Sequence, residues 1–253
     1  MKKIIALLVV CLLASVGVQA AIIYQDNFGE DGLGVNAGVG GGLTSRTIRQ
    51  HSWDDTGVLQ FVTSANTHYL NRAIAYTDNT FQSSQGFKLT VDYFWTSTLG
   101  ASSLSFGLVS DDTDLSTYSG FHPFSGDTNV YSFGVNPDNG NYAFTDGSSV
   151  TNLDNASGLL GPSSTDFEVA MTVAPDGSGG ADFAWSIDGV NQGSKNIAVF
   201  DFNKSFHFVA YGQDDQGNKG INAVTLEAIP EPAALTLVGL SGLGFMWIKK
   251  RFS

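Results

Sequence analysis

Residues 87–95, FKLTVDYFW, decide the fold class of this 253-residue chain. Apolar residues at Phe87, Leu89 and Val91 alternate with polar ones, and a period of two indicates a β-strand with one buried face. A second strand is predicted at residues 104–109, LSFGLV, after a Ser/Gly turn. The short separation predicts that the two segments form an antiparallel hairpin.

The same pattern recurs along the chain. The turn NPDNGN at residues 136–141 contains an Asn-Gly pair, which supplies the positive φ angles of a tight hairpin. No segment between the chain's two ends has a sustained helical period, and about ten to twelve strands are expected in two packed antiparallel sheets. The further predicted strands are residues 130–135, 142–145, 167–173, 182–187, 206–211 and 223–228.

The composition excludes several functions. The chain has 12 Lys and Arg against 24 Asp and Glu, a formal net charge of −12. Residues 21–229 hold seven basic and 23 acidic residues, which gives −16. A nucleic-acid-binding protein needs cations to neutralise phosphates, so nucleic acid is not expected as a partner. These 209 residues suit one all-β domain.

The N-terminal segment has the pattern of an export signal. Residues 1–20, MKKIIALLVVCLLASVGVQA, contain Lys2 and Lys3, then an apolar run, then small residues. This predicts a secretory signal peptide cleaved after Ala20, because the apolar run of ten residues is too short to span a bilayer. The single cysteine, Cys11, lies in this run, so the mature protein is predicted to have no disulfide and no thiolate site.

The C-terminal segment, residues 230–253, has three parts. Pro230, Glu231 and Pro232 come first, and the uncharged run AALTLVGLSGLGFMWI follows at residues 233–248. Sixteen residues make about 24 Å of helix, enough to cross a thin bilayer. The basic residues Lys249, Lys250 and Arg251 are expected to hold the C-terminus in the cytoplasm. The segment therefore predicts a transmembrane helix.

These three parts in this order resemble the PEP-CTERM sorting signal of exopolysaccharide-producing Gram-negative bacteria. The resemblance implies recognition by a membrane-embedded exosortase, in that family a cysteine-dependent transpeptidase thought to cut near the Pro-Glu-Pro. It covers only residues 230–253. An ordinary single-span anchor is the alternative, and both would use the extended backbone that the two prolines impose.

The strand order of residues 21–229 resembles the laminin-G-like or concanavalin-A-like jelly roll, an all-β antiparallel two-sheet sandwich. The residues that carry this resemblance are the opening IYQDNF at 23–28, the 87–95 and 104–109 pair, and the closing INAVTL at 221–226. Such folds host lectins, hydrolases and structural modules, so the fold alone does not define the function.

Catalytic residues of a glycoside hydrolase are not evident. Such enzymes need two carboxylates that face each other across a bound sugar. Glu30, Glu168 and Glu227 are the glutamates before the sorting motif, and no two are neighbours in sequence. The paired glutamates of the family's hydrolases are absent, so a non-enzymatic protein is predicted.

Clustered carboxylates are the candidates for a metal site, because Ca²⁺ prefers oxygen ligands. Asp111, Asp112 and Asp114 fall within four positions after a predicted strand. The fold resemblance implies a structural calcium ion between the first and last strands, and Asp26 and Asn222 are the matching positions. The alternative is that these are solvated turn residues on an acidic surface.

Aromatic residues could provide stacking surfaces for a glycan. Trp95 and Trp185 lie in predicted strands and are assigned to the core, whereas Trp53 beside two aspartates is expected to be exposed. His207 is expected to face outward from its strand. Together the sequence predicts an exported envelope or extracellular-matrix protein, associated with exopolysaccharide; a lectin or a carbohydrate-active enzyme on the same fold is the alternative.

Overall fold

The computed structural model describes residues 20–28, 43–49, 52–55, 59–62, 71–95, 103–116, 130–136, 141–146, 150–153, 165–214 and 219–229. These residues form fifteen strands in two antiparallel sheets, which confirms the predicted two-sheet β-sandwich. Among the described strands and turns there is no helix that could cross a membrane. The predicted signal peptide and sorting segment lie outside the described residues.

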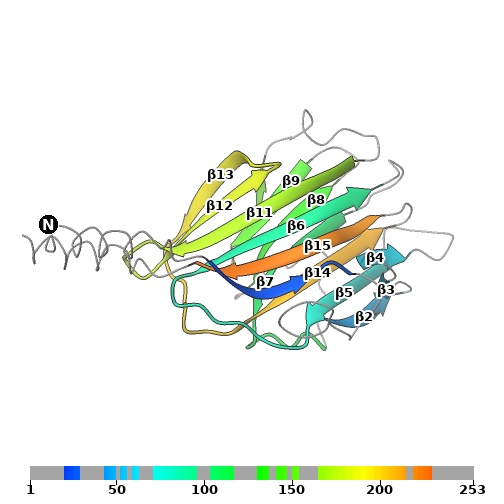
Figure 1. The fold of residues 1–253 in the computed structure, drawn as a ribbon, viewed down its shortest axis with the longest axis horizontal. Helices are drawn as coiled ribbons and strands as arrows, with labels where there is room; N and C mark the ends of the chain where they lie inside the picture. The colour runs from blue at the N-terminus through cyan, green and yellow to red at the C-terminus, as the bar shows by residue number, and fades with distance from the viewer. Residues whose placement is uncertain are drawn as a thin grey trace, which may run out of the picture.

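The first sheet has eight strands, and it contains both the first and the last strand of the domain. Its order is β13-β12-β11-β6-β15-β4-β3, with β1 also paired to β15. Figure 1 shows β13, β12, β11, β6 and β15 side by side in this order. The strands are β1 (Ala21–Asp26), β3 (Ser52–Asp55), β4 (Leu59–Val62), β6 (Phe87–Trp95), β11 (Thr165–Pro175), β12 (Ala181–Ile187), β13 (Val190–Ile197) and β15 (Lys219–Ala228).

The second sheet has seven strands in the order β10-β9-β8-β7-β14-β5-β2. The predicted hairpin around residues 136–141 is confirmed by the pairing of β8 with β9, and the 167–173 and 182–187 pair by β11 with β12. The strands are β2 (Leu43–Arg49), β5 (Asn71–Thr77), β7 (Ser103–Ser110), β8 (Val130–Asn136), β9 (Asn141–Asp146), β10 (Val150–Leu153) and β14 (Phe206–Asp214).

The predicted hairpin of residues 87–95 with 104–109 is wrong. β6 pairs with β11 and β15 in the first sheet, whereas β7 pairs with β14 and β8 in the second. The two strands face each other across the core, where Tyr93 and Phe106 have ring centroids 5.0 Å apart. Alternation identifies the buried face of each strand, but it does not say which sheet a strand joins.

The core lies between the sheets and is rich in aromatic residues. Tyr131 of β8 stacks on Phe183 of β12 at 5.4 Å, and Phe87 of β6 meets Phe206 of β14 edge-on at 5.7 Å. Trp185 is 4% exposed, which confirms its assignment to the core. Offset or edge-on aromatic pairs stabilise a core beyond the area that they bury. The described domain is therefore stabilised by packing between its sheets.

β15 is an internal strand although it ends the domain. β6 pairs with it along one side, whereas β4 and then β1 pair with it along the other. The register of β15 against β6 shifts between Ile221 and Ala223, so Asn222 is the extra residue of a β-bulge. Asn222 also marks the point where the outer neighbour of β15 changes from β4 to β1.

Candidate functional site

The outer face of the seven-stranded sheet carries a second apolar cluster. Ile74, Val109, Val130, Val209 and Tyr211 form it together with Leu115 of the segment after β7, and all are buried. They do not belong to the core cluster between the sheets. Ser105, which faces Tyr211 in the register, is also buried, and its hydroxyl has no hydrogen-bond partner among the described residues. The outer face of the seven-stranded sheet therefore carries a group of buried, mainly apolar side chains.

Tyr76 and His207 lie at the edge of this cluster and are half-buried. Tyr76 packs against the cluster from β5, and its ring meets the His207 ring edge-on with centroids 6.1 Å apart. The Nδ1 atom of His207 is 2.7 Å from the carbonyl oxygen of Thr77. A carbonyl can only accept, so Nδ1 carries the proton and Nε2 is the acceptor of the neutral ring. The pair combines an aromatic surface with a hydrogen-bonding group.

Four carboxylates gather on the outer face of the eight-stranded sheet. Glu168 of β11 lies opposite Asp92 of β6 in the register, and the Glu168 backbone N–H donates to Asp188 Oδ1 at 2.9 Å. Partial burial raises the pKa of Asp92, and the negative charges of Asp166 and Asp188 raise it further. Asp166, Glu168 and Asp188 are exposed. The face is thus an acidic patch open to solvent.

Asp26, one of the predicted calcium ligands, points into the core and is 3% exposed. Its Oδ1 accepts the backbone N–H of Phe28 at 2.8 Å, and its Oδ2 accepts the Tyr24 hydroxyl at 3.3 Å. Phe28 has a φ of 49°, so this Asx-type contact holds a buried residue in the left-handed region. Val224 faces Asp26 in the register, and Asn222 precedes Val224 by two residues on β15. The fold therefore brings these two positions close in the ladder.

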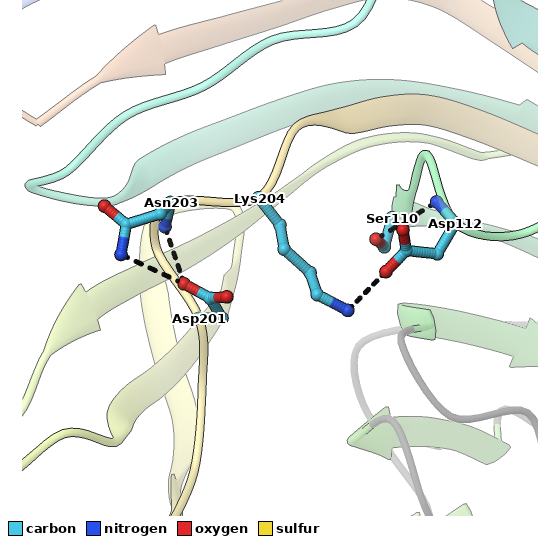
Figure 2. Close-up of polar contacts among 5 residues, drawn as sticks. All are labelled: Ser110, Asp112, Asp201, Asn203 and Lys204. Atoms are coloured by element: carbon cyan, nitrogen blue, oxygen red, sulfur yellow. Dashed lines mark hydrogen bonds and ion pairs between the residues drawn. The ribbon is translucent and has the colours of Figure 1, made fainter.

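The other predicted ligands follow β7. Asp112 pairs with Lys204, and this ion pair links the segment after β7 to the segment before β14 (Figure 2). The hydrogen bond from Lys204 is the main cause of a lowered Asp112 pKa. Asp114 Oδ1 accepts the backbone N–H of Ser116 at 3.0 Å, so it caps a turn. Asp111 is exposed.

Three of the five predicted ligands already have partners in the described structure. Asp112 already has a cationic partner, and the oxygens of Asp26 and Asp114 hold local backbone turns. No group of three or more His, Cys, Asp or Glu among the described residues is arranged to hold a metal ion. A calcium ion stays a prediction, and the function proposed below does not depend on one. The sorting residues Pro230, Glu231 and Pro232 and the basic residues Lys249, Lys250 and Arg251 lie outside the described residues.

Comparison with known proteins identifies the fold. No protein-family model matches the chain, and no curated protein matches its sequence. Three of the similar solved structures are a carbohydrate recognition domain, a lectin-like defence protein and a structure described with O-glycanases. The potassium-bound carbohydrate recognition domain of Emp46p aligns with a TM-score of 0.53 and 11% identity, over 74% of this chain and 89% of that one.

Arcelin-5, a lectin-like defence protein from Phaseolus vulgaris, aligns with a TM-score of 0.51 and 11% identity, over 75% of this chain and 93% of that one. A structure described with the endo-acting O-glycanases of the human gut microbiota aligns with a TM-score of 0.56 and 10% identity, over 83% of this chain and 100% of that one. The chain therefore has the concanavalin-A-like jelly-roll fold of lectin domains. At these identities the likeness defines the fold and leaves the ligand open.

Two of the arrangements described above are not evident from the sequence. Tyr76 lies in the strand Asn71–Thr77, which is not among the predicted strands. Asp92 and Glu168 are 76 positions apart in the sequence and meet only through the β6–β11 register. The outward orientation of His207 is confirmed, because it shares an outer face with Val109, its partner in the register.

Proposed function

We propose that residues 21–229 form an exported, non-enzymatic carbohydrate-binding domain that acts in the cell envelope or the extracellular matrix. The main support is the match of the two-sheet sandwich, over 74% of this chain, to the carbohydrate recognition domain of Emp46p. The ligand class that fits the predicted setting is an exopolysaccharide. With a formal charge of −16 on the domain, a neutral glycan is favoured over an acidic one.

Tyr76 and His207 are the side chains proposed to contact the glycan. Sugar rings have apolar C–H faces that pack on aromatic rings, and their hydroxyls need hydrogen-bond partners. The half-buried Tyr76 ring supplies the apolar face, and the His207 ring, whose Nδ1 is held by the Thr77 carbonyl oxygen, supplies a hydrogen-bonding group through Nε2. The contact of Nδ1 with Thr77 holds the His207 ring in place before a ligand arrives.

A glycan-binding assay on the purified domain tests this function. We expect binding to at least one neutral polysaccharide, and a loss of affinity of about tenfold or more for Tyr76→Ala and for His207→Ala. Phe94→Ala is the matched control, because Phe94 is a half-buried aromatic residue in β6 of the other sheet. Absence of binding to any neutral glycan, or an equal loss in Phe94→Ala, would overturn the proposed site.

Export and sorting form the second part of the proposal. The signal peptide of residues 1–20 directs export, and residues 230–253 hold the chain in the inner membrane through the C-terminal helix until an exosortase acts near the Pro-Glu-Pro. The intact mass of the protein from the envelope and medium of the native host tests this. We expect residues 1–20 and the segment after Pro232 to be missing. Mature protein that retains residues 233–253 would contradict sorting.

Glycan hydrolysis is the second candidate function. The observation that favours it is the opposed pair Asp92 and Glu168 in a fold shared with an O-glycanase structure. We prefer carbohydrate binding to hydrolysis as the function, because Asp92 and Glu168 lie side by side on one exposed sheet face. Hydrolysis needs two carboxylates that flank the glycosidic bond from opposite sides. Release of reducing ends that is abolished by Glu168→Gln and retained in Glu227→Gln would support an enzyme instead.

A further inference from the structure

The ladder between β5 and β14 ends one residue before β5 does. Its last pair is Val209 with Tyr76. Thr77, the final residue of β5, would face Phe208 if the ladder continued. Thr77 and Phe208 are both fully buried, so their backbone groups need partners inside the protein. The contacts of Thr77 therefore show what replaces the missing pair.

Thr77 binds β14 through two different oxygen atoms. Its Oγ1 accepts the backbone N–H of Phe208 at 3.2 Å, and its carbonyl oxygen lies 2.7 Å from Nδ1 of His207. In a continued antiparallel ladder the N–H of Phe208 would donate to the Thr77 carbonyl oxygen instead. The hydroxyl of Thr77 thus takes the place of its carbonyl as the acceptor, and the carbonyl is left for the imidazole ring.

The hydroxyl of Thr77 decides which donor its carbonyl oxygen receives. Phe208 is fully buried, and a buried backbone N–H without an acceptor is costly. Without the hydroxyl, the acceptor that the ladder provides for this N–H is the Thr77 carbonyl oxygen. Nδ1 of His207 would then compete with a buried backbone N–H for one oxygen atom.

The contact with Thr77 fixes both the proton and the direction of the His207 ring. A carbonyl oxygen can only accept, so Nδ1 carries a proton and Nε2 is the ring nitrogen left for a ligand. Tyr76 precedes Thr77 in β5, and its ring meets the His207 ring edge-on with centroids 6.1 Å apart. One buried residue therefore adjoins the first ring in the chain and holds the second by a hydrogen bond.

We propose that Thr77 is the positioning residue of the Tyr76 and His207 site. Its hydroxyl accepts the Phe208 N–H, so its carbonyl oxygen is available to hold Nδ1 of His207, and Nε2 is presented to the ligand in one orientation. A ring that is held before the ligand arrives lowers the entropy cost of binding. The effect on affinity rests on the proposed carbohydrate-binding function, whereas the state of the His207 ring does not.

Nitrogen NMR of the histidine rings tests the geometry without a glycan. The spectra are recorded at about pH 9, where an ordinary imidazole is neutral and its two tautomers can be told apart. The His207 signals are assigned from their absence in His207→Ala. We expect the proton on Nδ1 in the wild type and in Thr77→Ser, which keeps a hydroxyl. Thr77→Val has nearly the same shape without the hydroxyl and should give a mixture of tautomers. A wild-type ring protonated only on Nε2, or an unchanged tautomer in Thr77→Val, would overturn the proposal.

Binding to a neutral polysaccharide tests the consequence for the site. We expect Thr77→Val to lose about two- to tenfold in affinity, the effect of releasing one ordered side chain. Thr77→Ser should restore most of this affinity. Thr172→Val is the matched control, because it makes the same change at a half-buried threonine in β11 of the other sheet, and it should bind like the wild type. An equal loss in Thr172→Val, or full affinity in Thr77→Val, would contradict the positioning role.

Failure of this proposal and failure of the proposed function can be told apart. A wild-type domain that binds no glycan would remove the function, while the NMR spectra would still decide whether Thr77 holds His207. A domain that loses affinity in His207→Ala but not in Thr77→Val would keep the site and remove the role of Thr77. The wild-type tautomer needs no variant, so it remains decisive if Thr77→Val does not fold.

Discussion

Asp92 of β6 lies directly opposite Glu168 of β11, so two carboxylates occupy facing positions on one sheet surface. Like charges in opposed positions destabilise an antiparallel pair. Partial burial, followed by the charges of Asp166 and Asp188, raises the pKa of Asp92 above its ordinary value. The folded protein therefore disfavours the ionised form of Asp92.

Neutralising Asp92 should stabilise the domain at pH 7. For Asp92→Asn we expect a gain of about 0.5 kcal/mol and a rise in Tm of roughly 1–2 °C. Because the pKa of Asp92 is raised in the folded state, ionised Asp92 destabilises the fold, and this destabilisation grows as the pH rises from the ordinary pKa to the raised one. The stability gained by Asp92→Asn should therefore shrink as the pH is lowered towards 4. Asp111→Asn makes the same charge change at an exposed turn and is the control for the loss of one negative charge. Thermal melts from pH 4 to 7 check this.

Tyr93 has a buried hydroxyl without a hydrogen-bond partner among the described residues. Complete burial raises its pKa well above the ordinary value. An unsatisfied buried hydroxyl costs about 1–3 kcal/mol, so Tyr93→Phe should increase the free energy of unfolding by about 1 kcal/mol. Tyr24→Phe is the control: it removes a buried hydroxyl that donates to Asp26 and should destabilise the domain. Urea denaturation of both variants measures the difference.

Gly86 cannot be replaced by a residue with a side chain. Its φ is +95°, and a Cβ atom would lie 1.9 Å from the Val173 carbonyl oxygen, a backbone atom. Gly86→Ala should lose about 3 kcal/mol or more. Gly177→Ala isolates the backbone effect, because Gly177 also has a positive φ but no neighbouring atom within 4 Å of the position that a Cβ would take. That variant should lose only about 1 kcal/mol. Equal losses in chemical denaturation would contradict the steric explanation.

Asp26 is expected to be a turn-forming residue. Asp26→Ala removes the acceptor of the Phe28 N–H and should cost about 2 kcal/mol. Asp26→Asn keeps an acceptor oxygen and should restore most of this stability. The predicted calcium ion has a separate signature: millimolar Ca²⁺ would raise the Tm of the wild-type domain, and the rise would be smaller in Asp26→Asn. No shift in the wild type would remove the calcium prediction.

The fold class could be read from the sequence because alternation and turn residues are local signals. Strands, the β8–β9 and β11–β12 hairpins, and the buried position of Trp185 follow from such signals. Sheet membership does not. The chain crosses from one sheet to the other between β6 and β7, and a period of two is the same on either side of that crossing.

The candidate site depends on long-range register, which a single sequence does not contain. Tyr76 meets His207 because β5 pairs with β14, and Asp92 meets Glu168 because β6 pairs with β11. Asp112 is a similar case, since its cation is Lys204, 92 positions further along the chain. The sequence therefore shows that negative charges cluster after β7, but it does not show which cation pairs with them.

The adjacency of Ala21 and Ala228 makes the domain suitable for circular permutation. A short linker could join residue 229 to residue 21, and new ends could be opened at the exposed Asp188-Gly189 turn between β12 and β13. In such a permutant β13 would begin the chain and β12 would end it. The fold would then be preserved, while the chain ends, and with them the place where a terminal segment can be attached, would move to the opposite end of the sheet.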